Sequence, residues 1–66
     1  MKAVVNGEVW ELADGATVAD VLRRLGAPAT GVAVARRGEV VPRASWPATP
    51  VHDGDDIEVL TAVQGG

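Results

Sequence analysis

The chain has 66 residues, no cysteine, and a net charge of −3 from 6 basic and 9 acidic side chains. The lack of cysteine excludes disulfides, thiolate metal sites and a cysteine nucleophile, and the negative charge argues against nucleic acid or an anionic membrane as the main partner. A signal-peptide pattern and a long apolar run are both absent from the sequence, so we expect a cytoplasmic protein without a membrane span.

Residues 1–12 are expected to form a β-hairpin. Asn6-Gly7 is the strongest short signal for a two-residue turn, because both residues tolerate positive φ. Such a turn fixes the register, and side chains alternate between the two faces. The predicted core face carries Met1, Ala3, Val5, Trp10 and Leu12. A slip by one residue would bury Lys2 and Glu11 instead, so the register should hold.

A helix is expected from Thr17 to Leu25. Thr17 and Asp20 form a start like a capping box. An apolar stripe at helical spacing follows, made of Val18, Val21, Leu22 and Leu25. Gly26 and Pro28 end the helix. Arg23-Arg24 could be a basic docking spot, but a solvated last turn that suits the negative helix end is the more common reading.

Two further strands are expected at 31–35 and 39–41. The first is apolar on both faces, which indicates a strand inside the sheet. Arg36-Arg37-Gly38 between them is interpreted as an exposed hairpin tip. Residues 43–46 are expected to make one irregular helical turn whose Trp46 covers one end of the core, and Pro47 and Pro50 should keep the next segment extended.

The last strand is expected at 56–62, after an acidic turn around Asp53-Gly54. The turn lacks the spacing of a calcium loop, and the single histidine, His52, has no second ligand nearby; we therefore expect no metal site. Alternation places Leu60 and Ala62 on the exposed face of this strand. An exposed apolar strip beside the chain end indicates a docking surface.

These elements predict a single α+β domain, residues 1–66, in a ββαββ order. The arrangement is that of a β-grasp (ubiquitin-like) fold, a four- to five-stranded mixed sheet covered on one face by one helix. The first and last strands should be parallel neighbours at the centre. Residues 63–66 should then leave the sheet as a flexible C-terminal tail.

The tail is the only candidate for chemistry, because one histidine and one serine make no convincing catalytic triad. Gly65 and Gly66 can pass through a gap too narrow for a side chain, and Gly66 offers its α-carboxylate. That group is ionised and inert at neutral pH, so a partner must first convert it to an acyl-adenylate. Attack by a lysine would then make a protein modifier, and attack by a sulfur donor would leave a thiocarboxylate.

Over essentially its whole length the sequence resembles the sulfur carrier proteins of thiamine biosynthesis (ThiS family). The resemblance rests on Val41-Pro42-Arg43 with Trp46, on Val51 with Asp53-Gly54-Asp55 and Ile57, and on terminal Gly65-Gly66. Asn6 in the opening hairpin, and Gly15 with Thr17-Val18 and Leu22, also fit. The turn Arg36-Arg37-Gly38 departs from the Asn-bearing turn frequent in the family, but it carries no chemistry.

The resemblance implies a protein co-substrate, not an enzyme. Gly66 would be adenylated by an E1-like adenylyltransferase that holds ATP and magnesium, and would receive sulfur from a cysteine-derived persulfide. The Gly66 thiocarboxylate would then donate sulfur to the thiazole ring in thiazole synthase. Partner contacts would be made by Gly65, Gln64, Val63, Ala62 and Leu60, and the chain itself would bind no cofactor. The alternatives are a carrier for molybdopterin or cysteine synthesis, a ubiquitin-like modifier, and a β-grasp binding domain whose terminal glycines have no function.

Overall fold

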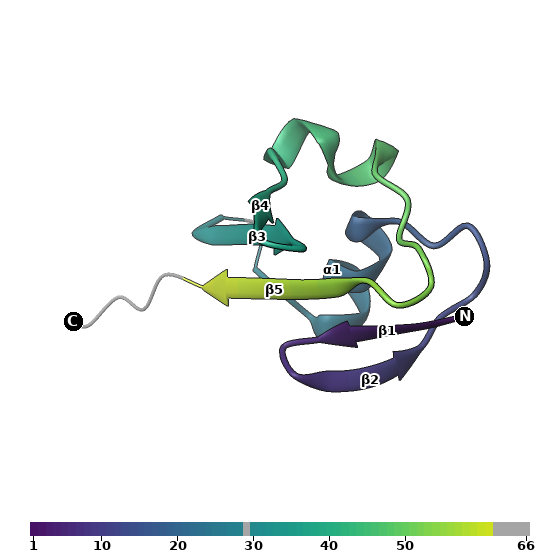
Figure 1. Ribbon diagram of the computed structural model, residues 1–66. Helices are drawn as coiled ribbons and strands as arrows, with labels where there is room; N and C mark the ends of the chain where they lie inside the picture. The colour runs from purple at the N-terminus through teal and green to yellow at the C-terminus, as the bar shows by residue number, and fades with distance from the viewer. Residues whose placement is uncertain (29, 62–66) are drawn as a thin grey trace.

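The computed structural model describes residues 1–28 and 30–61. In it the chain forms a five-stranded sheet with one α-helix packed on it (Figure 1). The elements in chain order are β1 (Lys2–Val5), β2 (Glu8–Glu11), α1 (Val18–Leu25), β3 (Val32–Arg36), β4 (Glu39–Val40), the 3₁₀-helix η1 (Arg43–Ala48) and β5 (Asp56–Thr61). The strand order across the sheet is β2-β1-β5-β3-β4. The expected α+β, β-grasp architecture is confirmed.

The β1–β2 hairpin has the register that the Asn6-Gly7 turn predicts. Val5 lies opposite Glu8 and Lys2 lies opposite Glu11. Asn6 and Gly7 have φ angles of 50° and 82°, the positive values that a type I′ turn requires. The predicted faces follow: Ala3, Val5 and Leu12 are buried, and Val9 on the other face is 68% exposed.

The last strand, β5, runs through the centre of the sheet. It is parallel to β1, with Val5 opposite Ile57, and antiparallel to β3, with Val34 opposite Val59. The predicted central, parallel pairing of the first and last strands is therefore confirmed. The strand predicted to lie inside the sheet, β3, is also internal, because β4 pairs with its other edge.

Helix α1 ends at the predicted Leu25 and begins at Val18, directly after the predicted capping residue Thr17. Thr17 is the N-cap of a complete capping box with Asp20, and Gly26 is the C-cap at φ 75°. Both arginines of the last turn have partners within the chain. Arg23 donates to Asp20 (3.1 Å), and Arg24 donates to the Glu11 carbonyl (2.8 Å) while its guanidinium lies 4.5 Å from the centre of the Trp10 ring. These contacts support the structural reading of the arginine pair.

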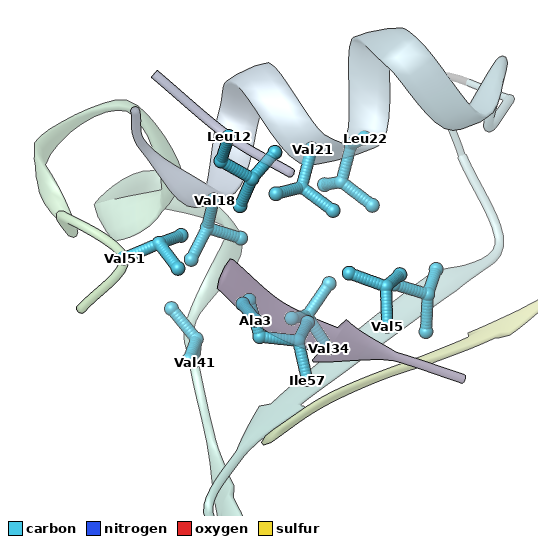
Figure 2. Close-up of a cluster of buried hydrophobic side chains, with 11 residues drawn as sticks. Ala3, Val5, Leu12, Val18, Val21, Leu22, Val34, Val41, Val51 and Ile57 are labelled. Carbon is cyan, nitrogen blue, oxygen red and sulfur yellow. The ribbon is translucent and has the colours of Figure 1, made fainter. Parts of the chain in front are cut away.

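The hydrophobic core lies between α1 and the face of the sheet that α1 covers. Figure 2 shows Val18, Val21 and Leu22 of the helix above Val5 and Ile57 of the central strands. Val18, Val21 and Ile57 have no exposed surface. Leu25 is an exception to the predicted stripe: it is 39% exposed, because it lies in the last turn of the helix.

The 43–48 segment differs from its prediction. The expected single turn is a six-residue 3₁₀-helix that runs through Pro47, so the prediction of an extended segment from Pro47 was wrong. Proline is tolerated there because a short 3₁₀-helix makes few backbone hydrogen bonds that need its missing N–H. Trp46 packs against the core as predicted, and its indole N–H donates to the Val41 carbonyl (2.9 Å).

The interpretation of Arg36-Arg37-Gly38 as an exposed hairpin tip is confirmed for Arg37 and Gly38, which are exposed turn residues, and needs correction for Arg36. Arg36 is the last residue of β3, is half-buried, and donates to the Pro50 carbonyl (2.8 Å). Both guanidinium groups lie about 4 Å from the carboxylate of Asp55, at 4.0 and 3.9 Å. The turn is therefore tied to the segment that leads into β5.

Candidate functional site at the end of β5

The predicted docking residue Leu60 lies where the prediction places it. It belongs to β5 and is 64% exposed on the face of the sheet turned away from α1, which we call the open face. The other predicted site residues, Ala62, Val63, Gln64, Gly65 and Gly66, lie outside the described residues. The structure therefore locates the strand that leads to the tail, and the roles of the tail residues stay predictions.

An open depression of about 390 Å³ lies beside Leu60. Its lining comes from the end of β5 and the start of β3: Gly31, Val32, Ala33, Leu60 and Thr61. Leu60 and Ala33 are direct cross-strand neighbours. The depression is open to solvent, has the volume to take an apolar side chain, and includes Thr61, the last residue of β5.

A side-chain hydrogen bond connects the hairpin to the same end of β5. The Val59 N–H donates to Asn6 Oδ1 (2.8 Å), and the Asn6 N–H donates to the Ile57 carbonyl (2.9 Å). The turn residue Asn6 thereby extends the β1–β5 pairing by its side chain. The sequence suggested Asn6 only as a turn residue, and its contact with β5 has no local sequence signal.

Negative charge surrounds the start of β5. Asp56 and Glu58 are exposed, and alternation places them with Leu60 on the open face. Asp55 differs from them: it is 1% exposed and accepts a hydrogen bond from the His52 N–H (2.8 Å). Asp53 likewise accepts from the Lys2 N–H (2.8 Å). Two of the four acids around this turn thus have structural roles, in agreement with its reading as a turn.

The site offers little side-chain chemistry in residues 1–28 and 30–61. That part of the chain contains no cluster of three or more His, Asp or Glu side chains suited to a metal ion. It also contains no helix long and apolar enough to cross a membrane. Ser45 lies in η1 and His52 in the loop before β5, and no side-chain hydrogen bond joins them. The described part of the site is thus an exposed surface at the end of β5 without a metal-binding cluster of side chains.

Known proteins resemble this chain over its whole length. Residues 3–66 match the model of the ThiS family. The sulfur carrier protein ThiS of Escherichia coli is 33% identical over 66 residues, which cover 100% of both chains. The crystal structure of the thiamine biosynthesis protein ThiS from Geobacter metallireducens superposes with a TM-score of 0.83 at 38% identity and covers 100% of both chains.

A third relative is a larger protein. A thiazole synthase of Paramagnetospirillum magneticum is 39% identical to this chain over 66 residues. The match covers 100% of this chain but 20% of that protein, so the chain spans one fifth of its length. Fold, full-length sequence matches and the family model agree, and the chain belongs to the ThiS family.

Proposed function

We propose that this chain is a sulfur carrier of thiamine biosynthesis and that the C-terminal carboxylate of Gly66 carries the sulfur. The observation that carries the proposal is the match to a sulfur carrier protein over 100% of both chains. Two features are consistent with it. The central strand β5 leads toward the tail, and Leu60 is exposed beside it.

The proposed chemistry uses main-chain atoms. A carboxylate oxygen of Gly66 attacks the α-phosphorus of ATP, pyrophosphate leaves, and an acyl-adenylate forms. A persulfide sulfur then attacks the acyl carbon and displaces AMP. A thiol cleaves the resulting S–S bond, as in thiol–disulfide exchange, and leaves the thiocarboxylate on Gly66. The ATP and magnesium belong to an E1-like adenylyltransferase, and the persulfide derives from cysteine.

The proposed acceptor is thiazole synthase, where the thiocarboxylate supplies the sulfur of the thiazole ring. The relative that carries a similar 66-residue segment within a thiazole synthase supports this choice, because a fused segment acts at a high effective concentration next to its partner. In the proposed reactions Gly65 and Gly66 enter both enzyme sites. Gln64 and Val63 form the adjoining tail, and Leu60 and Ala62 contact the partner surface.

Intact-mass analysis tests this proposal. The chain is incubated with an adenylyltransferase, ATP, magnesium and a persulfide donor, and its mass is followed. Exchange of one oxygen for sulfur at the C-terminus supports a carrier. A ladder of conjugated proteins would instead indicate a ubiquitin-like modifier, and an unchanged mass with every activating enzyme tried would contradict both.

The acceptor needs its own test. Expression of the chain in a thiazole-requiring strain that lacks its sulfur carrier should restore growth without thiazole. Thiocarboxylate formation without rescue would favour a carrier for molybdopterin or cysteine synthesis. Deletion of Gly66 is the matched control: it should abolish both activation and rescue, and it should leave the melting temperature almost unchanged if the tail buries little surface.

A further inference from the structure

The pairing of β5 with β3 shows which backbone groups of β5 face β1. The Arg37 N–H donates to the Asp56 carbonyl (2.9 Å), which fixes the alternation along this antiparallel pair. In such a pair, residues with hydrogen-bonded partners alternate with residues whose N–H and C=O point to the opposite side. The backbone N–H and C=O of Leu60 therefore pair with Ala33 of β3. The N–H and C=O of Val59 and of Thr61 point toward the β1 side.

The pairing with β1 ends before β5 does. The Val4 N–H donates to the Asp55 carbonyl (2.8 Å), and the Asn6 N–H donates to the Ile57 carbonyl (2.9 Å). Asn6 Oδ1 then accepts from the Val59 N–H (2.8 Å). The chain turns back at Asn6-Gly7 into β2, and in Figure 1 β5 extends past the tip of this hairpin.

The next pair of groups along β5 is consequently unpaired. Among the described residues, no hydrogen bond reaches the Val59 carbonyl or the Thr61 N–H from the β1 side. In a parallel pair, a single residue of one strand bonds to two residues of the other strand. Its carbonyl accepts from the N–H of one residue, and its N–H donates to the carbonyl of the residue two positions earlier. The two free groups therefore have the spacing that a single residue of an added strand requires. Leu60 and Thr61 are exposed and Val59 is 7% exposed, so the solvent-accessible part of this edge is its Thr61 end.

We propose that the edge of β5 from Val59 to Thr61 is a strand-addition site for an extended segment of the adenylyltransferase that activates the chain. This inference rests on the proposed function and adds the mode of docking to it. A strand placed there lies beside Thr61, the last residue of β5, and so brings the enzyme next to the part of the sequence that it must receive. Strand addition takes affinity from main-chain hydrogen bonds and specificity from neighbouring pockets. The depression beside Leu60 is such a pocket.

Charge indicates the chemistry of the added segment. Asp56 and Glu58 precede Leu60 on the open face and are exposed, and the whole chain has a net charge of −3. A segment with a lysine or arginine facing these acids, and an apolar side chain facing Leu60, is complementary. The same charges oppose the approach of a second copy of this acidic chain, which is why we assign the edge to the enzyme.

Amide hydrogen exchange tests the edge directly. The probe is the adenylyltransferase that activates the chain in the mass assay above, added unlabelled to ¹⁵N-labelled chain. The Thr61 N–H should exchange fast in the free chain and at least about 10-fold more slowly in the complex. The Leu60 N–H, which pairs with β3, should be protected in both and serves as the internal control. Fast exchange of Thr61 in a complex that still adenylates Gly66 would overturn the inference and leave the proposed function intact.

A main-chain substitution provides the second test. A chain of 66 residues is accessible to chemical synthesis, so the amide between Leu60 and Thr61 can be replaced by an ester, which removes the Thr61 N–H and weakens the Leu60 carbonyl as an acceptor for Ala33 of β3. Because the Thr61 N–H has no partner among residues 1–28 and 30–61, the melting temperature should fall only by the weakening of the bond from Ala33 to the Leu60 carbonyl. The KM for adenylation should rise about 5-fold, the loss of one hydrogen bond, with kcat retained.

The outcomes separate the possible occupants. An unchanged KM for the ester variant would contradict strand addition by the enzyme. Protection of the Thr61 N–H that grows with chain concentration in the absence of enzyme would show a second copy at the edge, and would also contradict it. Failure of every adenylyltransferase to modify Gly66 would instead overturn the proposed function itself.

Discussion

Replacement of Asn6 by glycine should destabilise the domain through the end of β5. Glycine tolerates the φ of 50° at this position but lacks the oxygen that accepts from the Val59 N–H. A partly buried N–H without its partner costs about 1–2 kcal/mol. The extra freedom of glycine in the unfolded chain adds to this loss, and relief of the positive φ of asparagine offsets it.

The expected effect is large for so small a domain. Total stability is roughly 3–10 kcal/mol at about 0.05–0.15 kcal/mol per residue. A loss of about 1–2 kcal/mol should lower the melting temperature by about 4–15 °C. Thermal unfolding by circular dichroism, together with urea titration at 25 °C, measures it.

Asn6→Asp is the matched control, because aspartate also tolerates positive φ and keeps an acceptor oxygen. It should retain most of the stability that Asn6→Gly loses. Equal losses in the two variants would show that the Val59 hydrogen bond is not the cause. A melting temperature of Asn6→Gly equal to that of the unchanged chain would refute the reasoning altogether.

Three other changes test separate parts of the structure. Ile57→Ala removes a side chain with no exposed surface and should cost about 2–5 kcal/mol, enough to leave much of the chain unfolded at 37 °C; a loss below about 1 kcal/mol in urea titration would contradict the core assignment. Hydrogen bonds with the Thr17 N–H and side chain lower the pKa of Asp20. The ionised carboxylate therefore stabilises the folded chain. This contribution is complete above the unfolded pKa of about 3.9 and is lost as the pH falls through the lower folded pKa. The stability difference between the unchanged chain and Asp20→Asn should therefore be constant from pH 7 to pH 5 and shrink by pH 3 in urea titrations, and a difference that grows with acid would be the wrong sign. Leu60→Asp should leave the melting temperature within a few degrees, because Leu60 is 64% exposed, and should raise the KM for adenylation; an unchanged KM would remove Leu60 from the docking surface.

Local sequence signals predicted most of the fold. The Asn6-Gly7 turn sets the hairpin register, and Thr17 and Gly26 set the bounds of α1, because the backbone angles and hydrogen bonds at these positions are decided by neighbours in the sequence. The central position of β5 also followed from the element order. The burial of Leu25 was predicted wrongly, because helical periodicity does not indicate where the sheet beneath the helix ends.

Contacts between distant residues could not be predicted in this way. Asn6 accepts from Val59, which lies 53 residues further along the chain, and Asp55 is buried near Arg36 at the end of β3 and Arg37 of the following turn. Both polar side chains looked like ordinary turn residues, since their partners come together only in the folded sheet. The exposed Leu60 was predictable because strand alternation alone separates it from Ile57 and Val59.

The measurement that tests the central claim most directly is the intact mass of the chain after reaction with adenylyltransferase, ATP and a persulfide donor. Fragmentation should place a single sulfur-for-oxygen exchange at Gly66, and the product should support thiazole formation when thiazole synthase and its other substrates are added. Sulfur found at any other position, or a fully loaded chain that thiazole synthase cannot use, would contradict the account.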